Sequence, residues 1–140
     1  MRGQEYLSFI NMMKKSRPGR NTASEDLDLI IQALKKQPEA GLDKDKYYSF
    51  RFLMVSGMLM ESNPTPAQKD EIIRLTKQYY NYPEYRYSGT AGGEVKMVAF
   101  SIMNHFKSKE LVAEASALTQ GVPSPLRDTA MKYLENARSF

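Results

Sequence analysis

Residues 92–140 read GGEVKMVAFSIMNHFKSKELVAEASALTQGVPSPLRDTAMKYLENARSF, and this stretch decides the fold. Its apolar side chains recur at helical spacing in three successive segments that are separated by turns of a few residues. The three segments are 94–106, 109–120 and 125–138. Ser108 is placed to cap the second segment, while Ser124 and Pro125 form an N-cap and N1 pair for the third. The C-terminal third of the chain therefore predicts three short amphipathic helices.

The upstream part of the chain carries the same helical periodicity in four further segments. These segments are 4–15, 24–37, 43–61 and 66–80. Thr65, Pro66 and Gln68 form a capping-box arrangement at the start of the last one. The segment 43–61 is apolar around most of its circumference, so we expect it to be the central and most buried helix. No segment has the alternation of a strand, and the sequence predicts an all-α chain of about seven antiparallel helices in a single domain over 1–140.

Two pieces of the C-terminal stretch carry a family resemblance. EVKMVAFSIMNHFKSKELVAEASAL (94–118) and SPLRDTAMKYLENA (124–137) each combine a small or charged helix start with paired apolar residues. The first of them also contains a tight turn and a shorter second helix. This pattern resembles HEAT-type α-helical repeats, and it is clearest in 92–140. The resemblance implies an α-α superhelix whose successive helices form one extended binding face. An irregular helical bundle is the alternative that fits the same periodicity.

Composition excludes several classes of function. The 140 residues include no cysteine, which rules out disulfides, thiolate catalysis and cysteine-ligated metal sites. No stretch approaches the roughly 18 apolar residues of a membrane span, so we expect no membrane insertion. The N-terminus lacks the basic, apolar and small-residue order of a signal peptide. We therefore expect a soluble protein of the cytoplasm.

Candidate catalytic and metal-binding residues are scarce. The one histidine, His105, falls in the last turn of a predicted helix, where a partner for the helix dipole is the ordinary role of a histidine. The chain has no GxSxG, HExxH or EF-hand pattern. Gly92 and Gly93 precede a helix start but have no Walker lysine, and Glu94 would repel a phosphate there. We therefore expect a non-enzymatic protein with no catalytic residues, no cofactor and no metal.

A tyrosine-rich loop over 81–93 is the strongest candidate for a binding surface. Tyr79 to Tyr87 holds five tyrosines and one arginine, and these two residue types dominate the hot spots of protein interfaces. The residues predicted to contact a partner are Tyr80, Tyr82, Tyr85, Arg86 and Tyr87. In the alternative arrangement Tyr79 and Tyr82 fold back onto the core, and the other tyrosines cover the loop. The sequence thus favours a protein–protein interaction module, such as a small adaptor or an immunity-type inhibitor that occludes the active site of another protein.

The basic N-terminal segment supports a second hypothesis. The net charge of +4 arises within residues 1–20, since the remaining residues carry equal numbers of basic and acidic side chains. Four of the basic side chains are close enough in the sequence to contact phosphates or an acidic protein: Lys14, Lys15, Arg17 and Arg20. The alternative function is therefore a nucleic-acid-binding helical repeat that uses this segment.

The nucleic-acid hypothesis predicts an affinity that depends steeply on salt. If the four basic side chains neutralise phosphates, replacing all of them by glutamine should abolish binding to duplex and single-stranded probes at low salt. A gel-shift titration of the native protein and the variant, repeated at two salt concentrations, makes the measurement. Absence of any shift for the native protein at low salt would remove this function.

Overall fold

The computed structural model describes residues 24–38, 46–82 and 93–140. Over these residues it contains six α-helices and no strand, which confirms the predicted all-α class. The helices are α2 (Ser24–Lys35), α3 (Lys46–Glu61), α4 (Pro66–Asn81), α5 (Glu94–His105), α6 (Val112–Leu118) and α7 (Pro125–Ala137). The helix predicted at 4–15 lies outside the described residues. None of the described helices has the length and apolar character needed to cross a membrane.

Local capping chemistry explains two of the helix starts. Thr65 accepts a hydrogen bond from the backbone N–H of Gln68, and the Gln68 side chain accepts one from the backbone N–H of Thr65, so α4 begins with a complete capping box. Ser124 accepts from the backbone N–H of Arg127 at the start of α7. A proline follows each of these caps at the first helical position, where its missing N–H has no cost. Both starts were readable from the sequence.

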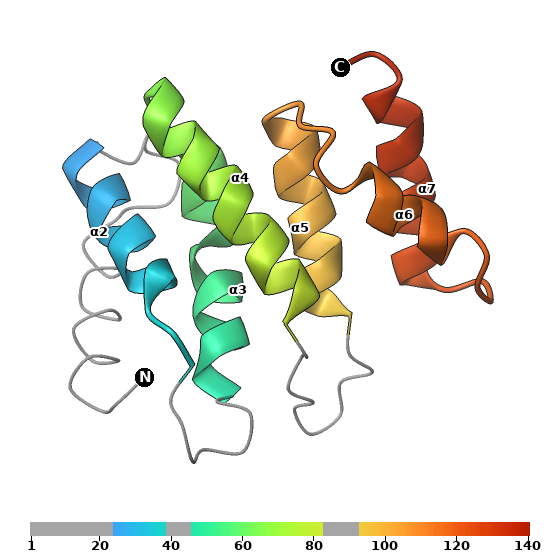
Figure 1. Ribbon diagram of the computed structural model, residues 1–140, viewed down its shortest axis with the longest axis horizontal. Coiled ribbons are helices and arrows are strands. Elements are labelled where there is room, and N and C mark those ends of the chain that lie inside the picture. The colour runs from blue at the N-terminus through green and yellow to red at the C-terminus, as the bar shows by residue number, and fades with distance from the viewer. Residues whose placement is uncertain (1–23, 39–45, 83–92) are drawn as a thin grey trace.

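The helices follow one another along the long axis of the molecule, from α2 at one end to α7 at the other (Figure 1). α5 lies in the middle and packs against α3, α4 and α7, while α6 packs mainly on α7. The expectation that 43–61 forms the central helix is corrected here, because α5 is the helix that the two halves of the structure share. The resemblance to HEAT-type repeats remains a prediction.

Two hydrophobic clusters explain why α5 holds this position. Val95 and Ile102 of α5, together with Phe106 at its C-cap, belong to a cluster with apolar side chains of α2, α3 and α4. Ala99 and Phe100 belong to a second cluster with residues of α6 and α7. α5 therefore buries apolar side chains in both directions, and removing those side chains from water is the main force that joins the two clusters.

Arg51 of α3 is the least expected core residue, since its side chain is 0% exposed. Its Nε donates to the Tyr79 hydroxyl at 2.8 Å, and its Nη2 donates to the backbone carbonyl of Lys36. The Tyr79 hydroxyl in turn donates to the carbonyl of Leu34 at 2.8 Å. The guanidinium carbon also lies 4.7 Å from the centroid of the Tyr48 ring. The Leu34 and Lys36 carbonyls belong to the C-terminal end of α2, where the helix dipole is negative, so the buried cation is stabilised by backbone and aromatic groups.

We predict that Arg51→Ala lowers the free energy of unfolding by about 3 kcal/mol. The loss combines an unfilled space in the core with the loss of a charged donor by the Lys36 carbonyl and the Tyr79 hydroxyl. Chemical denaturation followed by circular dichroism measures the change. Arg74→Ala is the matched control, because Arg74 is exposed and its ion pair should contribute no more than about 1 kcal/mol. Equal effects of the two substitutions would contradict the structural role of Arg51.

Candidate functional site: a groove between α4 and the α5–α6 connection

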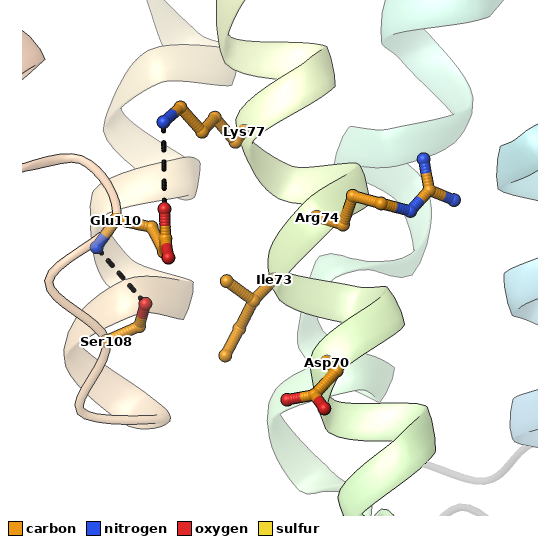
Figure 2. A pocket seen from close by; sticks show the side chains of 6 residues that line it. All are labelled: Asp70, Ile73, Arg74, Lys77, Ser108 and Glu110. Atoms are coloured by element: carbon orange, nitrogen blue, oxygen red, sulfur yellow. Dashed lines mark hydrogen bonds and ion pairs between the residues drawn. The ribbon is translucent and has the colours of Figure 1, made fainter.

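A hollow of about 400 Å³ opens between α4 and the residues that connect α5 to α6. We call it the α4–α6 groove. It is lined by Asp70, Ile73, Arg74, Lys77, Ser108 and Glu110. Figure 2 shows Ile73 in the middle, with Ser108 and Glu110 on the opposite wall. The volume is within the range of about 300–1,000 Å³ that is usual for ligand clefts.

Helix periodicity builds the first wall. Asp70, Ile73 and Lys77 are three and four residues apart on α4, a spacing that places their side chains on one face of the helix. Ile72 and Leu75 point instead into the first hydrophobic cluster, which holds α4 in place. Ile73 is half-buried and packs against both hydrophobic clusters. Its side chain also lines the groove.

A helix termination builds the second wall. Lys107 adopts a left-handed φ of 54°, and its N–H donates to the carbonyl of Asn104 at 3.2 Å. The N–H of Ser108 donates to the carbonyl of Met103 at 2.9 Å, which completes a Schellman motif at the end of α5. Glycine is the usual residue at this position, because a left-handed conformation costs other residues roughly 1–2 kcal/mol. The chain therefore turns sharply after α5 and runs opposite α4.

Tyr133 of α7 anchors this second wall. Its buried hydroxyl donates to the carbonyl of Ser108 at 2.5 Å and accepts from the backbone N–H of Leu111 at 3.3 Å. The Ser108 hydroxyl accepts from the N–H of Glu110 at 3.3 Å. The helix predicted over 109–120 is accordingly shorter in the structure, Val112–Leu118, because these bonds hold the preceding residues in a turn.

The four charged side chains of the groove, two acidic and two basic, differ in how they are paired. Lys77 Nζ lies 3.6 Å from Glu110 Oε2, and this ion pair joins the two walls (Figure 2). Arg74 extends away from Ser108 and Glu110, and its Nη2 lies 2.7 Å from Glu71 Oε2. The hydrogen bond from Arg74 holds the pKa of Glu71 below its ordinary value. Asp70 has no ion-pair partner among the described residues, whereas Arg74 shares the carboxylate of Glu71 with Lys35, whose Nζ lies 3.5 Å from Glu71 Oε1.

The tyrosines predicted to bind a partner are only partly described. Tyr80 is 5% exposed, and its ring packs edge-on against Phe100 with the centroids 5.4 Å apart. This placement corrects the expectation for Tyr80, because burial against α5 removes the ring from the surface. Tyr82 is half-buried, and its ring centroid lies 4.4 Å from that of Tyr48. The remaining predicted contact residues lie outside the described part of the chain: Lys14, Lys15, Arg17, Arg20, Tyr85, Arg86 and Tyr87.

The groove itself was not predicted from the sequence. The spacing of Asp70, Ile73 and Lys77 was visible in the sequence, but a mixed acidic, aliphatic and basic stripe is common on helix surfaces. No local signal could pair Lys77 with Glu110, because the two residues belong to different segments. His105, the one candidate base, lies exposed at the end of α5, with its ring against Phe106. In the ranges 24–38, 46–82 and 93–140, no three His, Asp or Glu side chains come together as a metal site.

Comparison with known proteins gave no match, whether against protein-family models, curated proteins or solved structures. The interpretation of the groove therefore depends on its own geometry and charges.

Alkaline titration tests the burial of Tyr80. Burial, together with the nearby charge of Glu114, raises its pKa from 10.0 to about 12. The folded state thus favours the neutral phenol, and the resulting stabilisation is complete below pH 10 and is lost as the pH rises toward 12. The tyrosinate absorbance of the native protein minus that of Tyr80→Phe should show one group titrating near pH 12. A difference curve with its midpoint at the ordinary tyrosine pKa would contradict the burial.

Proposed function

We propose that this protein is a non-enzymatic protein-binding module, an adaptor or an immunity-type inhibitor, and that the α4–α6 groove contacts the partner. The supporting observation is the arrangement of the groove. A half-buried aliphatic side chain, Ile73, lies at its centre, and charged side chains surround it. An apolar centre within a polar rim is the usual anatomy of a protein interface.

The anchoring of both walls also supports a binding role. α4 is held by its capping box and by the first hydrophobic cluster. The opposite wall is held by the Schellman motif and by the Tyr133 hydroxyl. A surface that is ordered before binding loses little conformational entropy when the partner docks, so more of the contact energy appears as affinity.

The predicted HEAT-type resemblance fits the same function. In such repeats, successive helices contribute side chains to one extended binding face. α4 carries one wall of the groove, and the tyrosine-rich segment follows α4 directly in the sequence. The proposed interface therefore combines the groove with Tyr85, Arg86 and Tyr87, whose residue types are favoured at hot spots.

Affinity isolation from the native host tests this proposal. The native protein and Lys132→Glu should retain the same partner, because Lys132 is exposed on α7 and lies outside the groove. Lys77→Glu should bind it more weakly, because the substitution replaces the ion pair that joins the two walls by two acidic groups that repel each other and distort the groove. We expect about a tenfold weaker affinity when the purified partner is titrated by calorimetry.

Two further variants complete the experiment. The double variant Lys77→Glu, Glu110→Lys can re-form the ion pair with reversed polarity, so it separates loss of groove structure from loss of charge recognition. Tyr85→Ala with Arg86→Ala tests the tyrosine-rich segment. A partner that binds the native protein, Lys77→Glu and the Tyr85/Arg86 variant equally, with all three folded by circular dichroism, would overturn the proposed interface.

A further inference from the structure

The α4–α6 groove carries information about the chemistry of its occupant. Of the four charged side chains that line it, Arg74 leaves the helix on the far side and pairs with Glu71. Lys77 and Glu110 neutralise one another. Asp70 alone forms no ion pair with another described residue, and Figure 2 shows its carboxylate on the same side of α4 as Ile73.

The position of Asp70 next to Ile73 restricts the occupant further. The two residues are three apart on α4, which corresponds to about 4.5 Å along the helix axis. In an extended peptide, side chains two residues apart point to the same side and are separated by roughly 6.5 Å. A lysine or arginine side chain is long enough to make up the difference between the spacing on the helix and the spacing in the peptide. Its apolar stem would then lie over the aliphatic centre of the groove.

We infer that the groove binds a basic segment of a protein partner, in which a lysine or arginine lies two residues from a large aliphatic residue. The cation pairs with Asp70, and the aliphatic side chain covers Ile73. This inference rests on the proposed binding function, and it adds the chemical class of the bound segment. An acidic segment placed in the same way is disfavoured because its carboxylate would meet the carboxylate of Asp70.

The magnitude of this preference follows from the exposure of the groups. Glu110 is 59% exposed and Lys77 is 45% exposed, so the charges of the groove remain in contact with water. Ion pairs in such surroundings contribute about 0.2–1 kcal/mol, which is a factor of roughly 1.4–5 in affinity. The charge of Asp70 therefore selects basic over acidic segments, while contact with Ile73 supplies most of the binding.

Blocked pentapeptides test the inference directly. The probe is acetyl-Ala-Lys-Ala-Leu-Ala-amide, together with the reversed order Ala-Leu-Ala-Lys-Ala and versions in which glutamine or glutamate replaces lysine. Titration into isotope-labelled protein should shift the NMR signals of Ile73 and Ser108 but not those of Leu29 on α2. We expect the lysine peptides to bind about 2–25-fold more tightly than the glutamate peptides, because attraction of lysine and repulsion of glutamate each contribute a factor of roughly 1.4–5.

A double-mutant cycle isolates the contribution of Asp70. Asp70→Asn should reduce the preference for lysine over glutamine by about 2–5-fold, and Asp70→Lys should reverse it. Glu135→Gln is the control, because Glu135 is exposed on α7 and lies outside the groove.

The outcomes separate this inference from the proposed function. Groove signals that shift equally with lysine and glutamate peptides, or a preference that Asp70→Asn leaves unchanged, would overturn the inference. Loss of the native partner from Lys77→Glu would still support the binding function in that case. If the lysine peptides shifted protein NMR signals only outside the groove, the assignment of the basic segment to this site would be overturned.

Discussion

The fold depends on one constraint, which is that α5 must bury apolar side chains on two sides. Val95, Ile102 and Phe106 pack with α2, α3 and α4, and Ala99 and Phe100 pack with α6 and α7. Because α4 lies on one side of α5 and the α6–α7 pair on the other, the two halves meet only along a seam. The groove lies at this seam, and Ile73 contacts both hydrophobic clusters there.

Buried polar side chains secure the helix ends on either side of the seam. Arg51 and Tyr79 bind the carbonyls of Lys36 and Leu34, where α2 ends. Tyr133 does the same for the turn between α5 and α6, where its hydroxyl bonds Ser108 and Leu111. Orphan backbone groups at helix termini are costly when they are buried, so these side chains replace water as hydrogen-bond partners. The Tyr133 bonds also give rigidity to the wall of the groove that contains Ser108.

This rigidity connects the fold to the proposed function. The aliphatic centre of the groove and the position of Asp70 are both determined by α4, whose start is held by the Thr65 cap. The facing wall is held by α7 through Tyr133. A basic segment of a partner would therefore meet a surface whose shape is already formed, and the unpaired carboxylate would distinguish it from an acidic segment.

Local chemistry was enough to predict the all-α class and several helix starts. The caps at Thr65 and Ser124 are hydrogen bonds between residues only three positions apart, so both partners can be identified from a short stretch of sequence. The apolar periodicity of 94–106 likewise identified a helix that begins at Glu94.

Contacts between distant segments decided the rest. Tyr80 is buried because α5 brings Phe100 against it, whereas its tyrosine-rich sequence alone indicated a surface residue. The helix after Ser108 begins only at Val112, because the Tyr133 hydroxyl holds the preceding turn. Arg51 is in the core because the Lys36 carbonyl at the end of α2 and the Tyr79 hydroxyl of α4 accept hydrogen bonds from its guanidinium. The groove lies where α4 and the turn after α5 face each other, with Lys77 opposite Glu110, and no periodicity within one helix encodes the distance between two segments.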